Sequence, residues 1–122
     1  MSASDLQNVL EILDEQYEGG VIKREPYQDE FFKGPIMETI QEMTDAERSY
    51  FVYFCTGNNY LPNDKKFRIF IEFSLDNDAL PVVHTCEQQL RLPRNAYNGS
   101  KTLFQDKLKQ AMFGTGCLMT IN

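Results

Sequence analysis

The sequence holds three thiols that could act as nucleophiles, and their neighbours differ. Cys55 lies in the apolar run FVYFC and Cys117 lies between a glycine and a leucine, and a free cysteine in such surroundings is most often a small core residue. Cys86 stands two residues after His84 and directly before the polar run 87–89. Polar neighbours favour partial exposure, which a reactive thiol requires, so Cys86 is the candidate catalytic residue.

His84 is the nearest group that could assist this thiol. Residues i and i+2 of an extended segment point to the same side, so the imidazole could take the Cys86 proton or stabilise the thiolate. The residues alone favour the plainer alternative, an exposed histidine beside an inert cysteine. His84 is the only imidazole and no Cys-x-x-Cys pair occurs, which disfavours zinc. The single histidine also disfavours a cysteine hydrolase, because that class of enzyme needs a histidine from elsewhere in the fold and an orienting Asn or Asp.

The segment before Gly19-Gly20 is predicted to form a helix. Leucine and valine at positions 6, 9, 10 and 13 have the spacing of one helix face. Ser4 and Gln7 have capping-box spacing, and Gly19-Gly20 favours a turn that ends the helix. The polar residues 21–30 contain a proline and are interpreted as a connecting loop.

Two more helices are predicted in the first half of the chain. Pro35 suits the first position of a helix, because its missing N–H costs nothing there, and an apolar stripe follows it. Thr44, with Glu47 three residues later, begins the next helix, and Thr56-Gly57 ends it.

The second half of the chain is predicted to alternate short strands with one helix. Phe67, Ile69, Ile71 and Phe73 alternate with Arg68, Phe70 and Glu72, so the apolar face of this strand should be buried. Leu80–Cys86 begins extended, because a proline disfavours helix in the residue before it. The remaining predictions are a turn at Asp76–Asp78, a short strand around Leu90 and Leu92 that Pro93 closes, a helix from Ser100 that Gly114 and Gly116 end, and a final strand over 117–122.

Composition and element order predict the fold class. The chain has 122 residues, 42% of them apolar and nine of them phenylalanine, which is enough to bury a core. No repeat, low-complexity tract or Pro/Gly/Ser-rich linker divides it. We therefore expect a mixed α/β fold: a single compact lobe over residues 1–122, with a small β-sheet packed with several helices.

Charge and cysteine usage exclude some partners and compartments. The net charge is −6, whereas a polyanion binder normally has a basic excess, so nucleic acid is not an expected partner. No apolar run approaches the roughly 18 residues of a membrane span, and the first ten residues lack the form of a signal peptide. The odd number of widely spaced cysteines fits a reducing compartment, so we expect an intracellular protein of the cytoplasm or nucleus.

Charge is also unevenly spread along the chain. Residues 1–50 carry twelve acidic and four basic side chains, whereas residues 91–110 carry five basic and one acidic. Two solvated faces explain this pattern most simply. The alternative is a polar surface that helps to orient a charged protein partner.

The stretch around Cys86 has a distinctive order of residues. Leu80-Pro81 comes first, then Thr85-Cys86, then a Leu-x-Leu-Pro that ends at Pro93. This order resembles the active-site segment of HECT-type ubiquitin ligases, in the C-terminal, catalytic lobe of that domain. Three further segments resemble this lobe in order and spacing: Tyr17–Gly20 its Tyr-x-Gly-Gly stretch, Thr44–Pro62 its helix leading into a Thr-Gly turn and a proline, and Lys107–Met112 its closing helix.

The resemblance implies an E3 ubiquitin transferase with a cysteine thioester intermediate. Cys86 would accept ubiquitin from a conjugating enzyme as a thioester and pass it to a lysine of a protein substrate. Thr85 could donate its N–H or hydroxyl to the oxyanion and His84 could favour the thiolate, and no metal or organic cofactor is required. The family's larger N-terminal lobe, which docks the conjugating enzyme, has no counterpart here, so we expect the chain to be part of a longer protein.

The chain departs from the family pattern in three places. The family usually places Phe and Asn after the catalytic cysteine, where this chain has Glu87 and Gln88. Asn63-Asp64 stands in place of a frequent glycine pair, and Cys117 stands where the family has a late phenylalanine that assists transfer to lysine. These departures leave open an alternative, a catalytically impaired lobe that binds ubiquitin or a partner protein without turnover.

Overall fold

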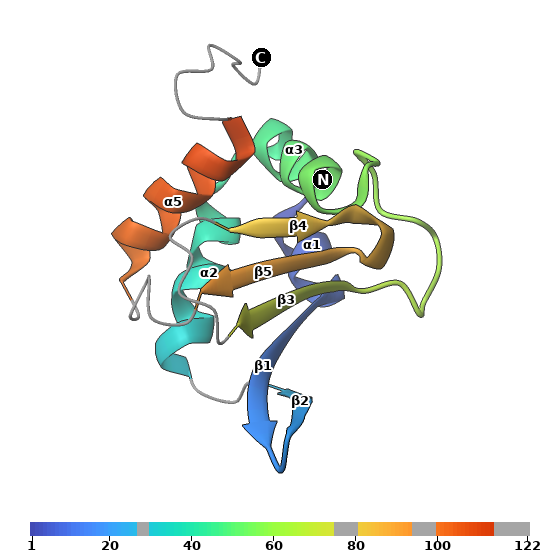
Figure 1. The fold of residues 1–122 in the computed structure, drawn as a ribbon. Coiled ribbons are helices and arrows are strands. Elements are labelled where there is room, and N and C mark those ends of the chain that lie inside the picture. Colours follow the sequence, from blue (N-terminus) through green and yellow to red (C-terminus); the bar gives the residue numbers. More distant parts are fainter. Residues whose placement is uncertain (27–29, 75–80, 94–99, 114–122) are drawn as a thin grey trace.

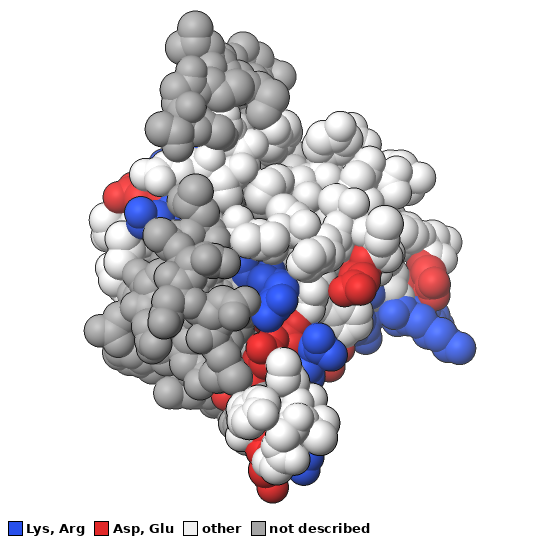
Figure 2. All heavy atoms as spheres, in the orientation of Figure 1, with Lys and Arg blue, Asp and Glu red and all other residues white. Residues whose placement is uncertain are grey.

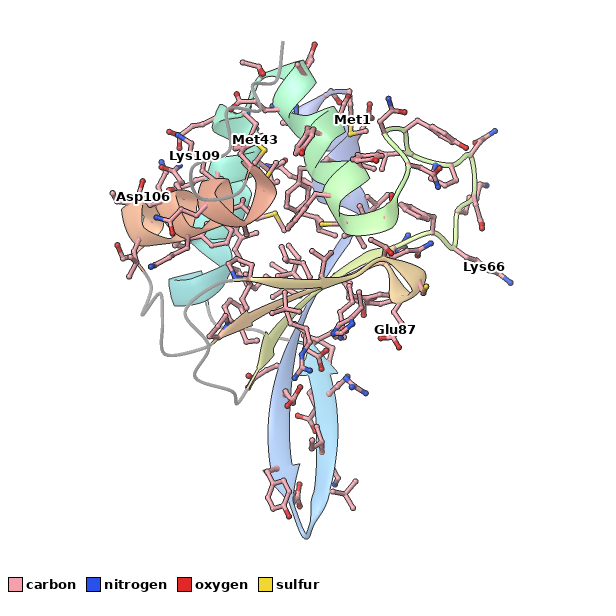
Figure 3. The ribbon with its side chains drawn as sticks, turned by 45° about the horizontal axis from the view of Figure 1, so that its top comes forward. Met1, Met43, Lys66, Glu87, Asp106 and Lys109 are labelled. Atoms are coloured by element: carbon pink, nitrogen blue, oxygen red, sulfur yellow. The ribbon has the colours of Figure 1, made fainter. Side chains whose placement is uncertain are left out.

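The computed structural model describes residues 1–26, 30–74, 81–93 and 100–113. They form one five-stranded mixed sheet in the order β2-β1-β3-β5-β4, with the helices gathered on one of its faces (Figures 1 and 3). The elements are α1 (Ala3–Val9), β1 (Leu10–Glu18), β2 (Val21–Pro26), α2 (Glu30–Glu42), α3 (Asp45–Thr56), β3 (Ile69–Ser74), β4 (Val82–His84), the 3₁₀ turn η1 (Thr85–Glu87), β5 (Gln89–Pro93) and α5 (Lys101–Phe113). The predicted mixed α/β lobe is confirmed.

The first predicted helix is wrong beyond Val9, and the loop predicted over 21–30 is wrong over 21–26, which form β2, and at Glu30, where α2 begins. The chain turns extended at Leu10 and forms the hairpin β1–β2, which projects from the body of the lobe (Figure 1). Gly19 and Gly20 both have positive φ, 59° and 82°, which is the backbone of a tight hairpin turn. The residue that caps the helix is Ser2, whose hydroxyl accepts a hydrogen bond from the Asp5 N–H, and not Ser4 of the predicted capping box.

Residues from Leu10 onward form a strand and not a helix because β1 has a paired strand on each side. It pairs antiparallel with β2 and parallel with β3, which places Leu10 beside Ile69 and Ile12 beside Ile71. Ile12 is buried in the core by this pairing. A helix over the same residues would leave the exposed edge of β3 unpaired.

Of the next two predicted helices, α2 begins earlier than expected and α3 begins where it was predicted. Pro35 lies inside α2 and not at its first position, because the helix already begins at Glu30. The capping box of α3 is confirmed: the Thr44 hydroxyl accepts from the Glu47 N–H, and the Glu47 carboxylate accepts from the Thr44 N–H. Gly57 ends α3 in the left-handed conformation, as its position after Thr56 predicted.

A buried guanidinium joins α2 to α3. Arg48, in α3, donates to the carbonyl oxygens of Ile40 (2.9 Å) and Met43 at the carboxyl end of α2, and to that of Met1 (2.9 Å). It also pairs with Asp45 at 2.7 Å. The last carbonyls of a helix have no partner within the helix, so Arg48 satisfies groups that would otherwise be buried without one.

The core lies between the sheet and the helices. The predicted alternation in β3 is confirmed on this face, where Ile69, Ile71 and Phe73 are buried. The core also takes up the following buried residues: Leu6 from α1, Ile36 and Ile40 from α2, Phe51, Val52 and Cys55 from α3, Leu90 and Leu92 from β5, and Phe104, Leu108 and Met112 from α5. The turn at Asp76–Asp78, the helix stop at Gly114 and Gly116 and the strand over 117–122 lie outside the described residues.

Candidate functional site

Cys86 lies in the turn that joins β4 to β5. The two strands pair antiparallel, and His84 opposite Gln89 is the last pair before the turn. The four residues between them, 85–88, are called the Cys86 turn here, and their first three form η1. Cys86 is exposed, as its polar neighbours predicted.

The backbone of the Cys86 turn is held at its end by Gln88. This residue has φ 54° and ψ 42°, and it is the one non-glycine residue with positive φ in the described part of the chain. Its N–H donates to the Thr85 carbonyl at 3.1 Å, and its carbonyl accepts from the Phe70 N–H at 2.9 Å. The turn is therefore closed on itself and also tied to β3.

The two described thiols differ in their chemistry. Cys55 is fully buried in α3, and burial raises the pKa of its thiol because a thiolate is poorly solvated in the core. A thiol is a nucleophile only as the thiolate and only where a second molecule can reach it. Cys86 meets the condition of access and Cys55 does not, while Cys117 lies outside the described residues.

His84 and Thr85 are exposed beside Cys86. The strand ends at His84, and Cys86 belongs to the 3₁₀ turn that follows, so the alternation of an extended segment does not set how their side chains are related. Within the described residues, no hydrogen bond joins the His84 imidazole to the Cys86 thiol. The roles assigned to His84 and Thr85 stay predictions.

The sheet face opposite the helices, called the outer face here, carries buried charge that the sequence reasoning missed. The alternation in β3 predicted that Glu72 would be on the polar side, yet its side chain is 0% exposed. One carboxylate oxygen accepts from the Arg24 guanidinium of β2, and the other accepts from the Gln89 side-chain amide of β5. Each oxygen therefore has its own donor, as a buried carboxylate requires.

A second pair lies next to the first. Glu15 of β1 is also buried, and it accepts a hydrogen bond from Arg91 of β5 at 2.9 Å. Figure 2 shows acidic and basic side chains side by side on this face, between the hairpin and the body of the lobe. Removal of the arginine from such a pair would cost about 3–5 kcal/mol, because the carboxylate would stay buried without its charged partner.

An open hollow of about 370 Å³ lies on the outer face beside the Cys86 turn. Its lining residues are Leu13, Arg24, Phe70, Glu87 and Gln89. Figure 3 shows Glu87 on the side of the sheet away from the helices, next to Cys86 in the chain. The hollow thus offers apolar contact, both signs of charge and an amide beside the turn that carries Cys86.

The described residues hold no cluster of three or more His, Cys, Asp or Glu that could bind a metal ion. None of the helices in the described ranges is long and apolar enough to cross a membrane.

Comparison with known proteins identifies the family. A search of curated proteins found no match. The model of the HECT-domain (ubiquitin-transferase) family matches residues 3–120, which is nearly the whole chain and includes the Cys86 turn and the sheet that carries it. The chain therefore belongs to the HECT-domain family of ubiquitin transferases, as a lobe of a HECT-type ligase.

Proposed function

We propose that this chain is the C-terminal catalytic lobe of a HECT-type ligase, in which Cys86 carries ubiquitin as a thioester before transfer to a substrate lysine. The observation that carries the proposal is the position of Cys86, exposed on a hairpin turn while Cys55 is buried. The match to a family of ubiquitin transferases supports the same assignment.

The first step is a thioester exchange. The Cys86 thiolate sulfur attacks the carbonyl carbon that links the C-terminal glycine of ubiquitin to the thiol of a conjugating enzyme. A new C–S bond forms on Cys86, and the conjugating-enzyme sulfur leaves as a thiolate. One thioester replaces another, so the step is nearly isoenergetic and depends mainly on thiolate supply and alignment.

The second step forms an isopeptide bond. The unprotonated amine of a substrate lysine attacks the Cys86 thioester, the C–N bond forms, the C–S bond breaks and the amine releases a proton. Thr85 would donate its N–H or hydroxyl to the oxyanion of both steps, and His84 would favour the thiolate. The hollow beside the turn would accommodate the residues that precede the reacting glycine.

The experiment uses the chain itself and ubiquitin whose C-terminal glycine carries a small-molecule thioester, because this donor needs no docking surface. We expect an adduct of the chain with one ubiquitin that a reducing thiol cleaves. Cys86→Ala should abolish the adduct, whereas Cys55→Ala and Cys117→Ser are the matched controls and should form it. An adduct that survives Cys86→Ala would overturn the assignment.

The same experiment decides between the remaining alternatives. Binding of ubiquitin without an adduct would favour the catalytically impaired lobe, for which the departures at Glu87, Gln88 and Cys117 are the sequence signal. Release of free ubiquitin without an accumulating adduct would favour a cysteine hydrolase.

A further inference from the structure

The Glu72 carboxylate is the most deeply buried acidic group of the described residues. We infer that Glu72 is a positioning residue for Cys86: it orders the Cys86 turn and the adjoining hollow, so that the nucleophile meets the ubiquitin thioester in one orientation. The inference deepens the proposed function and rests on it for its consequence in ubiquitin transfer.

Glu72 contacts a residue that directly follows the Cys86 turn. Gln89 donates its side-chain amide to Glu72 and directly follows Gln88, the last residue of the turn. Only three peptide bonds separate Gln89 from Cys86. Gln89 also pairs with His84 across the base of the turn, so a displacement of the Gln89 backbone on loss of its contact with Glu72 would move the end of the turn, including the Gln88 carbonyl that accepts from the Phe70 N–H.

The second donor extends this effect to the hollow. Arg24 reaches Glu72 from β2, across β1, and both Arg24 and Gln89 line the hollow beside Cys86. Two walls of the hollow are thus fixed by one buried carboxylate. Loss of that carboxylate would free both side chains at once.

Access and alignment make different demands on Cys86. The thiol is exposed, so a small alkylating reagent reaches it whatever the orientation of the turn. Ubiquitin loading needs the sulfur and the thioester carbonyl in a near-attack geometry, where a displacement of about 1 Å costs up to about 100-fold in rate. A positioning residue should therefore change loading and leave alkylation unchanged.

The test compares Glu72→Gln and Gln89→Met with the control Glu15→Gln, all in chains that carry Cys117→Ser. Glu15 is a matched control because it is also buried and paired with an arginine, but its partner Arg91 lies in the middle of β5 and not beside the turn. Three rates are measured: ubiquitin loading from the small-molecule thioester, iodoacetamide alkylation of Cys86, and alkylation of Cys55. Cys55 is buried, so its alkylation reports unfolding.

We expect Glu72→Gln and Gln89→Met to lower loading about tenfold, with Cys86 alkylation changed less than about twofold and Cys55 protected. The double variant should lose no more than the worse single variant, because both act through one contact. Amide hydrogen exchange adds a readout without ubiquitin: protection of the Phe70 N–H should fall in Glu72→Gln and not in Glu15→Gln.

Each contrary result has a distinct meaning. If Glu72→Gln and Glu15→Gln lower loading equally, or if the loss of loading follows Cys55 alkylation, the role of Glu72 is structural and the inference is wrong. If the parent chain itself forms no adduct, the proposed function fails. The exchange of the Phe70 N–H then decides alone whether Glu72 orders the turn.

Discussion

Gln88 occupies a backbone conformation that glycine adopts more easily, so we predict that Gln88→Gly stabilises the protein. A non-glycine residue in the left-handed region costs about 1–2 kcal/mol, and glycine loses about 0.5–1 kcal/mol more conformational entropy on folding. At φ 54° and ψ 42° the first contribution exceeds the second. The net gain is about 0.5–1 kcal/mol.

The side chain gives little reason for this gain to be lost. Gln88 is partly exposed, and within the described residues its side-chain amide makes no hydrogen bond. Gln88→Asn should lie between the parent and the glycine variant, because asparagine tolerates the left-handed region better than glutamine does. Asparagine is also the residue that the HECT family usually has at this place.

Urea unfolding measures the effect, with the slope of the transition required to stay constant. For 122 residues, with an unfolding entropy of about 2.1 cal/mol/K per residue, the gain corresponds to a rise in melting temperature of about 2–4 °C. Glu87→Gly is the control, since Glu87 lies in the same turn without positive φ and glycine there should destabilise. If both glycine variants destabilise equally, the strain assigned to Gln88 is absent.

Three other predictions follow from the described contacts. Arg48→Met should lower the free energy of unfolding by about 3 kcal/mol in urea titration, because the carbonyls at the end of α2 lose a charged donor, and Arg48→Lys should restore only part of it. Equal stability of Arg48→Met and the parent would contradict this. The hydrogen bond from Arg48 lowers the pKa of Asp45 below 3.8, so the contribution of the Asp45 carboxylate to stability is present above that pH and is lost as the pH falls through the lowered value. Asp45→Asn should therefore destabilise the protein at pH 7 and flatten the decline of its stability in acid. An unchanged profile of stability against pH would refute this prediction. In a chain with Cys117→Ser, iodoacetamide should modify Cys86 in the native state and Cys55 only after unfolding, because burial raises the pKa of Cys55 and blocks access to it. Mass spectrometry would detect the modified residue, and equal rates of modification at the two cysteines would show that the core opens readily.

Local signals in the sequence were enough to indicate the family and a candidate nucleophile, and to place one helix. The order of residues from Leu80 to Pro93 indicated both the family and Cys86 as the candidate nucleophile, because a motif is a property of neighbours in the chain. The capping box of Thr44 and the glycine after Thr56 set the two ends of α3 for the same reason: their hydrogen bonds join residues only a few positions apart.

The first third of the chain shows where local signals are ambiguous. Apolar residues at 6, 9, 10 and 13 match a helix, but those at 10 and 12 equally match a strand with one buried face. The choice is made by β3, whose Ile69 and Ile71 lie about sixty positions away and pair with Leu10 and Ile12. Free energy from burial and from strand pairing outweighs the local preference.

The surroundings of Cys86 were decided in the same way. The period of β3 placed Glu72 on the polar face, which by itself predicts exposure. Its burial depends on Arg24 from β2 and Gln89 from β5, which the sheet order brings to either side of it. The sequence by itself indicated which residue is the candidate nucleophile. Only the tertiary structure decided which residues of other strands contact Glu72 beside its turn, because a buried charge is stable only where its partners meet it in space.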